Sequence, residues 1–385
     1  MISSTDFATG HPCARPLGFL AVLMFSVGCG SGDSQAGMVA SVMPIRSVPL
    51  TVVEKPLFVT DDANQPILGQ PHSVSESSNG IFAIADMSDK DIKLYDRNGE
   101  RVGTVGREGE GPGEFTSLMS ATFVGDSIFA YDFAEDRLSI FGATGQFARS
   151  SEVRNEGVAT PWSIKSVDDR YLLSVGTPMD RVDRDFLGLF RTDGPCCPRS
   201  MMNLERYYDG GVPGLAQWTA VNADARADFV YASHDDSIFA FDYFGELVAA
   251  QRLPSELMPV SWRELLEEND GNPQHPDGSW IFDGHSLAMD VLAMDSSTVV
   301  VQLAQYNASG GVDRMDGGPI AILALNFEGE FGRFRLLGQH DAGGALLGRD
   351  ALGRPVIVGY ATGSTNSYTV SALEFVAAPD APSSS

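Results

Sequence analysis

A short strand-and-turn unit recurs along this chain, and its recurrence limits the possible folds more than any other feature. Residues 132–145 (DFAEDRLSIFGATG) repeat residues 86–99 (DMSDKDIKLYDRNG) in the same register, and residues 238–245 (IFAFDYFG) repeat residues 92–99. Each copy ends in a tight turn, where glycine accepts the positive φ that such a turn needs. Units that consist of strands alone and recur at a period of roughly 40–50 residues are typical of propeller blades.

The clearest copy, residues 80–115, predicts short strands at 81–85, 92–95 and 101–105, followed by a glycine-rich loop. Strands joined by tight turns form an antiparallel meander. One meander cannot bury both of its faces, so the copies must pack against one another around an axis. We therefore predict an all-β fold, a six-bladed β-propeller of four-stranded antiparallel blades. The blades are expected at about 68–110, 111–153, 157–205, 213–253, 283–337 and 338–377.

Residues 47–60 (SVPLTVVEKPLFVT) precede the first blade and have the composition of a strand. An open ring of blades would leave two free sheet edges, which can pair with other chains. We expect this N-terminal strand to pair with the last blade and so to close the ring. The propeller would then occupy residues 47–377, and the Ala/Pro/Ser-rich residues 378–385 would form a disordered tail.

The repeat has a specific signature. The pattern D-x-x-x-x-x-I-x-x-Y-D-x-x-G-E at 86–100, followed by G-x-x-G-x-G-P-G-E-F at 106–115, resembles an NHL repeat. The whole chain resembles the NHL-repeat-like six-bladed β-propeller lipoproteins of bacteria. Propellers of this kind serve mostly as binding platforms and, in a minority, as lyases or hydrolases. The resemblance therefore implies the fold and leaves the chemistry open.

Residues 1–29 have the features of an export signal. The apolar run at 17–27 is as long as the hydrophobic core of a signal peptide and too short to span a bilayer. It ends at Ser26-Val-Gly-Cys29, which resembles a lipobox, and this resemblance implies that Cys29 is acylated. The alternative is a plain secretory signal with an incidental cysteine. Residues 30–46 would be a flexible tether, and we expect an exported, membrane-anchored lipoprotein facing the periplasm or the cell surface.

The charge of the chain narrows the choice of partners. Its 51 acidic residues outnumber the 26 Lys and Arg residues, which gives a formal net charge of −25. A nucleic-acid partner is not expected, because binding phosphates requires clustered basic side chains. We expect a monomer that contacts a protein, peptide or glycan ligand and reaches the lipid bilayer through acylated Cys29.

Three histidines, His72, His285 and His340, are placed where the inner strands of blades one, five and six are expected to begin. Inner strands of a propeller point polar side chains into the central channel. Three imidazoles could converge there on a metal such as zinc, or on a substrate. The alternative is that they form hydrogen bonds to neighbouring loops. No cofactor is expected, and a divalent metal, zinc or calcium, is the alternative.

Two sets of acidic residues invite different interpretations. Lactonase-type propellers, which resemble this fold, hold calcium through oxygen ligands on the channel wall. That resemblance implies the candidate ligands Glu76, Asn222, Asp224 and Asp290. Other aspartates recur at matched positions of several blades. A turn needs a hydrogen-bond acceptor in every blade, whereas an enzyme needs a catalytic acid only once, so this repetition indicates a structural role. The residues predicted to cap backbone N–H groups in this way are Asp86, Asp96, Asp132 and Asp242.

One segment, 254–282, departs from the strand pattern. Ser261 followed by Glu264 is a capping box, which predicts the start of a short helix with Trp262 on its apolar side. The helix either covers the mouth of the channel, where Trp262 would contact a ligand, or packs against the edge of a blade.

The function predicted from these observations is that of an exported, membrane-tethered binding or interaction platform for a peptide, glycan or protein. A rigid ring would display its loops, and the mouth of the channel would be the binding site. The alternative is a metal-dependent lyase or lactone hydrolase that uses histidines or carboxylates of the same channel.

Overall fold

The computed structural model describes residues 50–60, 68–153, 158–176, 185–203, 221–226, 228–305, 320–329, 333–361 and 367–377. By its contacts the chain divides into Met1–Ser34 and Gln35–Ser385, and all of the described residues belong to the second unit. The predicted export signal with Cys29, the tether at 30–46 and the tail at 378–385 lie outside the described residues, so these predictions stay predictions.

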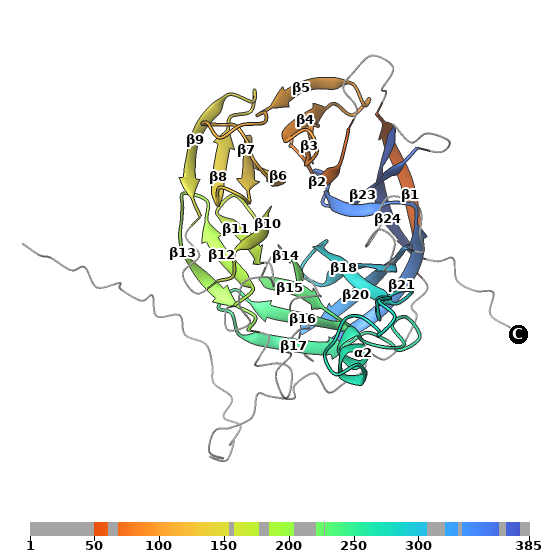
Figure 1. Ribbon diagram of the computed structural model, residues 1–385. Coiled ribbons are helices and arrows are strands. Elements are labelled where there is room, and N and C mark those ends of the chain that lie inside the picture. The colour runs from red at the N-terminus through yellow and green to blue at the C-terminus, as the bar shows by residue number, and fades with distance from the viewer. Residues whose placement is uncertain are drawn as a thin grey trace, which may run out of the picture. The chain divides into compact units, whose positions relative to one another are not determined.

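Six four-stranded units are arranged in a ring, which confirms the predicted six-bladed β-propeller (Figure 1). In each unit the chain runs from the innermost strand outward through antiparallel neighbours. Blades one to three are β2 (Pro71–Glu76), β3 (Phe82–Asp86), β4 (Asp91–Tyr95), β5 (Arg101–Val105); β6 (Leu118–Val124), β7 (Ser127–Asp132), β8 (Arg137–Phe141), β9 (Phe147–Glu152); and β10 (Pro161–Ser166), β11 (Tyr171–Gly176), β12 (Leu187–Arg191), β13 (Gly194–Met201).

The other three blades follow the same order, with one exception at the end of the ring. Blades four and five are β14 (Asn222–Arg226), β15 (Phe229–His234), β16 (Ser237–Asp242), β17 (Leu247–Arg252); and β18 (Ser286–Ala293), β19 (Thr298–Gln305), β20 (Ile320–Glu328), β21 (Arg333–Ala342). Blade six draws only three strands from its own part of the chain, β22 (Ala345–Arg349), β23 (Pro355–Tyr360) and β24 (Tyr368–Ala377).

The N-terminal strand β1 (Leu50–Val59) supplies the missing outer strand of blade six. It pairs antiparallel with β24, from Leu50 opposite Ala377 to Val59 opposite Thr369. This pairing satisfies backbone groups that would otherwise form an open sheet edge. The predicted closure of the ring by the N-terminal strand is therefore confirmed.

The ring is also closed at its inner side, where blades one and six meet. Strand β2 pairs in parallel with β22, with Val74 opposite Gly348. A Cβ atom on Gly348 would lie 1.7 Å from the carbonyl oxygen of Val74. Only glycine therefore permits this close approach of the two inner strands.

Other neighbouring inner strands are joined by side chains. The Ser73 hydroxyl accepts a hydrogen bond from the Ala121 N–H at 2.8 Å, and the Ser120 hydroxyl accepts one from the Ile164 N–H at 3.0 Å. Further round the ring, Asp224 accepts a hydrogen bond from the Ala293 N–H at 2.8 Å. Buried backbone groups need such partners, so the small polar residues of the channel wall hold the blades in place.

The recurring aspartates cap turns, as predicted. Asp86 accepts hydrogen bonds from the N–H groups of Gly69 and Gln70, at 2.6 and 2.9 Å. Asp132 does the same in blade two for Thr116 and Ser117, at 2.7 and 3.1 Å. Asp96 and Asp242 accept bonds from N–H groups within their own hairpin turns.

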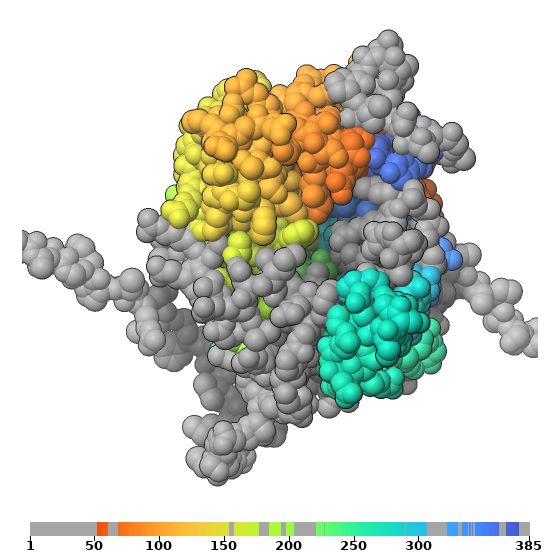
Figure 2. Space-filling view, viewed as in Figure 1, coloured from red at the N-terminus to blue at the C-terminus, as the bar shows by residue number. Residues whose placement is uncertain are grey.

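The segment between blades four and five forms the predicted helix, α2 (Trp262–Glu268), and its capping box is present. The N–H of Trp262 donates to Asp235, in the β15–β16 turn, at 2.8 Å. Trp262 is 2% exposed and stacks on Phe282, with ring centroids 3.9 Å apart. Figure 2 shows the region of α2, in cyan and green, as a projection separate from blades one and two, in orange and yellow. Trp262 and Leu266 belong to one apolar cluster with buried residues of blades five and six, so the helix packs against these two blades.

Blade five extends further than predicted. Strand β21 runs to Ala342, so His340 lies in the outermost strand of blade five, opposite Ile322. The inner strand of blade six, β22, begins only at Ala345. The predicted position of His340 at the start of an inner strand is therefore wrong, because the long β20–β21 hairpin continues past the point where the repeat pattern ended the blade.

The closure of the ring can be tested in β1. Phe58 is 6% exposed and packs its ring on Phe82 and Tyr95 of blade one, with centroids 5.1 and 5.8 Å away. We expect Phe58→Ala to lower the free energy of unfolding by about 3–5 kcal/mol, because it empties a buried site. Urea denaturation measures this loss.

The neighbouring Val59, which is 48% exposed, is the control. Val59→Ala should change the free energy of unfolding by no more than about 0.5 kcal/mol. Equal stability of the two variants would contradict the role of β1 in closing the ring.

Candidate functional site

A cavity of about 730 Å³ follows the axis of the ring. Its wall contains residues of all six inner strands, β2, β6, β10, β14, β18 and β22. Volumes of roughly 300–1,000 Å³ are usual for small-molecule sites. The cavity is therefore the candidate functional site.

At the start of the inner strands the cavity is aromatic. Trp162, the second residue of β10, is 36% exposed and lines the cavity. Its indole meets the rings of His72 and Phe133 edge to face, with centroids 6.2 and 5.9 Å away. Because two neighbours hold the indole in place, Trp162 offers a fixed apolar surface to a ligand.

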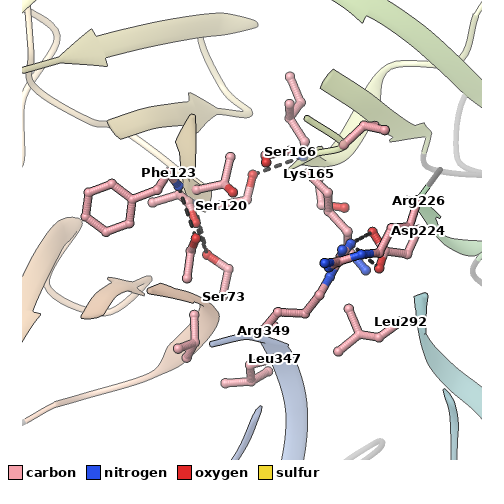
Figure 3. Close-up of a pocket in the computed structure, with 18 of the residues that line it drawn as sticks. Ser73, Ser120, Phe123, Lys165, Ser166, Asp224, Arg226, Leu292, Leu347 and Arg349 are labelled. Atoms are coloured by element: carbon pink, nitrogen blue, oxygen red, sulfur yellow. Dashed lines mark hydrogen bonds and ion pairs between the residues drawn. The ribbon is translucent and has the colours of Figure 1, made fainter. Parts of the chain in front are cut away.

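Two ion pairs cross the cavity between blades that are not neighbours. Lys165 of blade three donates to Asp290 of blade five, with Nζ and Oδ1 2.9 Å apart. Arg349 of blade six binds both carboxylate oxygens of Asp224 in blade four. Figure 3 shows Arg349 reaching across to Asp224 while Lys165 points toward the same region. Each pair neutralises one carboxylate of the wall.

A third cation, Arg226, lies beside this cluster at the end of β14 (Figure 3). Within the described part of the chain, no hydrogen bond or ion pair joins Arg226 to another residue. Burial, and then the neighbouring Arg349, lower the pKa of Arg226, but a guanidinium stays charged in proteins. The carboxylates of Asp224 and Asp295 lie near enough to favour this charge, although neither forms a hydrogen bond to Arg226 among the described residues.

Gly353, in the β22–β23 turn, makes room for this guanidinium. A Cβ atom on Gly353 would lie 2.9 Å from both terminal nitrogens of Arg226. Gly353 also has a positive φ of 80°, a conformation that glycine adopts without strain. The turn of blade six therefore fixes where the Arg226 side chain of blade four ends.

Tyr243 adds an unsatisfied polar group to the same wall. Its hydroxyl oxygen is buried and has no hydrogen-bond partner among the described residues. Burial, followed by the nearby carboxylates of Asp168 and Asp224, raises the pKa of Tyr243, so the hydroxyl keeps its proton. It is one of eight such buried side-chain atoms among the described residues, and a water molecule or a ligand would satisfy it.

The mouth at the ends of the inner strands is acidic. Asp168 and Asp169, in the β10–β11 turn, are exposed and line the cavity there. Glu76 and Asp350 line it too, but Glu76 pairs with Arg97 at 2.7 Å and Asp350 with Arg354 at 2.6 Å. Arg226 is thus a cation inside an acidic entrance.

The predicted metal ligands are not brought together. His72 lines the cavity, and its Nδ1–H donates to the carbonyl oxygen of Met119 at 2.6 Å. His285 precedes β18, as predicted, but is not among the residues that line the cavity. His340 lies on β21, and its side chain is outside the described part of the structure. Trp262 is buried against Phe282 and does not line the cavity either.

The four candidate calcium ligands do line the cavity, but each already has a partner. Asp224 and Asp290 are neutralised by Arg349 and Lys165, and Glu76 is bound by Arg97 and by the Ala351 N–H. Asn222 donates to the carbonyl oxygen of Ala288 at 3.3 Å. Calcium would have to displace ammonium or guanidinium groups from these carboxylates.

One close group of carboxylates does occur elsewhere among the described residues, formed by Asp86, Asp89 and Asp91. The buried ammonium of Lys93 is bonded to Asp86 and Asp89 and lies 3.4 Å from Asp91. Burial alone would lower the pKa of Lys93, but these carboxylates outweigh burial and raise it. The cation of this group is therefore supplied by the protein itself.

The cationic residues of the cavity, Lys165, Arg226 and Arg349, were not predicted from the sequence. The one available signal is the alternation along β14, where Asn222, Asp224 and Arg226 face the channel at every second position. Asn222 and Asp224 were predicted to lie on this wall, and the same pattern extends to Arg226.

Comparison with known proteins gives the same fold. The family described as DUF5128, 6-bladed beta-propeller, matches residues 56–160. A Bacteroides fragilis NCTC 9343 protein, described as exported, is 16% identical, with a TM-score of 0.55 over 85% of this chain and 95% of that chain. A member of the duf4221 family from Bacteroides vulgatus ATCC 8482 is 8% identical, with a TM-score of 0.55 over 86% and 100% of the two chains.

Virginiamycin B lyase from Staphylococcus aureus is 10% identical, with a TM-score of 0.41 over 85% of this chain and 100% of that chain. A likeness of this size carries no argument about chemistry. No curated protein matches the sequence significantly. No helix within the described ranges is long and apolar enough to cross a membrane.

The metal content of the purified protein tests the predicted ligands. We expect no stoichiometric zinc or calcium, because His72 is bound to Met119 and the carboxylates of the wall are paired with cations. Inductively coupled plasma mass spectrometry should give the same background for wild type, His72→Ala and His285→Ala. A bound ion in wild type that is lost from His72→Ala would contradict this expectation and restore the metal site.

Proposed function

We propose that this chain is an exported propeller, tethered to a membrane by Cys29, that serves as a binding platform for a peptide, glycan or protein ligand at its central channel. The observation that carries the proposal is the 730 Å³ cavity on the ring axis. Its wall combines a fixed indole, Trp162, with polar groups from every blade. A concave site of this kind, with a few polar groups on a rigid frame, is suited to holding a small ligand.

The rigidity of the wall favours binding over catalysis. The ion pairs Lys165–Asp290 and Arg349–Asp224 brace the cavity across its width, and their charges are already neutralised. A general base or a metal ligand needs a group that is available to the substrate. The alternative, a metal-dependent lyase or lactone hydrolase, would use the same cavity and is tested by the metal measurement.

Filling the cavity tests where ligands bind. Ser163 is a half-buried residue of the wall, and Ser163→Trp would occupy much of the channel. Ligand-observed NMR with a mixed library of acids, amines, sugars and neutral aromatics should detect binding to wild type. We expect Ser163→Trp to lose these signals, because the indole takes the space of the ligand.

The matched control is Ser150→Trp, on the exposed outermost strand of blade two. It should bind the same compounds as wild type and show the same circular dichroism spectrum. If Ser163→Trp retains the wild-type set of bound compounds, the channel is not the binding site.

The membrane tether rests on the sequence around Cys29, which resembles a lipobox. The exported structural neighbour from Bacteroides fragilis supports export and leaves the lipid anchor to be tested. We expect Cys29→Ser to move the protein from the membrane fraction to the soluble exported fraction, because no acyl chain can be attached.

Immunoblotting of the two fractions measures this change, with Cys13→Ser as the control that should leave the distribution unchanged. Membrane association that persists in Cys29→Ser would remove the lipoprotein proposal and leave the alternative of a plain secretory signal.

A further inference from the structure

The two halves of the cavity wall differ in their chemistry. Blades four to six contribute charged side chains to the wall, among them Asp224, Arg226 and Arg349. The polar side chains that the inner strands of blades one to three contribute are mainly hydroxyls, from Ser73, Ser75, Ser120, Thr122, Ser163 and Ser166. Figure 3 shows Ser73 and Ser120 away from the charged group around Asp224. A ligand therefore meets hydroxyl groups on one side of the cavity and charges on the other.

The indole of Trp162 lies where the inner strands of the hydroxyl-bearing half begin. His72 of blade one donates to the Met119 carbonyl oxygen of blade two, and its ring meets Trp162 of blade three. The three inner strands are thus joined at this height of the channel. Although His72 and Phe133 contact it, Trp162 stays 36% exposed, so part of the indole is open to a ligand. A large aromatic surface held in a fixed position is suited to stacking.

Hydroxyl groups adjoin this indole. Ser163 follows Trp162 directly in β10, and Ser120 of β6 accepts a hydrogen bond from the backbone of β10 at 3.0 Å. The hydroxyls of Thr122, Ser163 and Ser166 line the cavity and form no hydrogen bond within the described part of the chain. Since a hydroxyl both donates and accepts, these side chains can bind polar groups of either kind.

The charged residues that line this half of the cavity do not serve the indole. Lys165 and Glu76 each form an ion pair, with Asp290 and with Arg97. Asp168 and Asp169 follow the opposite end of β10, at the other mouth. A charged ligand group at Trp162 would therefore find no unpaired counter-charge on the described wall beside it. A wholly apolar ligand would cover hydroxyls without satisfying them, which costs free energy.

We propose that blades one to three bind one sugar ring of a neutral glycan, stacked on the indole of Trp162. This inference rests on the proposed function of the channel as a ligand site and assigns the class of its ligand. A pyranose ring has a face of C–H groups, which suits an aromatic surface, and a rim of hydroxyls, which suits Ser163 and its neighbours. A peptide residue offers only one backbone N–H and one C=O, so a glycan matches this wall better.

An array of neutral and acidic glycans tests the assignment with the purified protein. We expect wild type to bind a set of neutral glycans that share a sugar, with no preference for glycans that carry carboxylate or sulfate groups. Isothermal titration calorimetry with the strongest neutral glycan then gives its Kd. This Kd should not change when the NaCl concentration is raised, because no ion pair with the ligand is formed.

Variants of the wall test the stacking contact. Trp162→Ala should weaken binding of this glycan about tenfold or more, because the stacking surface is removed. Trp162→Phe keeps a smaller ring and should retain part of the affinity, and Ser163→Ala should weaken binding by a smaller factor. Phe244→Ala is the matched control, since Phe244 is 76% exposed and does not line the cavity. It should leave the Kd unchanged, and all variants should keep the circular dichroism spectrum of wild type.

Tryptophan fluorescence gives a separate reading of the same contact. The chain has four tryptophans, and a sugar stacked on Trp162 should change the emission of wild type. Trp162→Phe should lose this change while calorimetry still detects the glycan. A change in emission that persists in Trp162→Phe would place the sugar at another site and overturn the assignment.

The assignment also fails if no neutral glycan of the array binds, if acidic glycans are preferred, or if Trp162→Ala binds as tightly as wild type. If such a result appears while Ser163→Trp still abolishes the binding of library compounds, the channel remains the ligand site and only the sugar assignment fails. If Ser163→Trp has no effect on those compounds, the proposed function fails first.

Discussion

The antiparallel pairing of β1 with β24 is the interaction on which the rest of the structure depends. Blade six has only three strands of its own, and without β1 its outer edge would be open. The pairing also sets where β22 lies, because β22, β23 and β24 belong to one sheet. At the inner end of that sheet, Gly348 allows β22 to meet β2, and this contact completes the wall of the channel. A closed ring thus brings side chains that are more than a hundred residues apart in the sequence to one cavity, as Lys165 and Asp290 show.

The wall of that cavity has two kinds of polar residue, which differ in the groups that they bind. Small side chains such as Ser73 and Ser120 form hydrogen bonds to the backbone of the next inner strand, at places where the inner strands, unlike β2 and β22, do not pair directly. The charged side chains reach further and meet across the axis, so they resist changes in the width of the channel. Arg226 belongs to neither group, since it forms no hydrogen bond or ion pair within the described chain and only lies near the carboxylates of Asp224 and Asp295. A residue that the frame does not need is the natural place to look for a ligand contact.

The fold was largely predictable from the sequence, because a meander with a repeated turn has few ways to bury its faces. The strands at 81–85, 92–95 and 101–105 and the capping aspartates are local features, and the structure confirms them. Closure by β1 followed from the cost of an open edge. The site was predicted less well, since it depends on which side chains meet across the ring. The predicted position of His340 was wrong because β21 continues to Ala342, beyond the expected end of blade five. Arg226 carried no local signal apart from its alternation with Asn222 and Asp224 on β14.

The connection between the first and the last described strands also sets an order of events during biogenesis. β1 is synthesised early, and its partner β24 follows more than three hundred residues later. An emerging chain therefore cannot shut its ring until nearly all of it has left the ribosome or crossed a translocation pore, and contacts so distant in sequence form slowly. Until then β1 has no partner strand to pair with and blades can stack only as an open fan. Because the ring closes late, the chain stays incompletely folded while it crosses a translocation pore. The pairing of β24 with β1 is then the last step in the formation of the native structure.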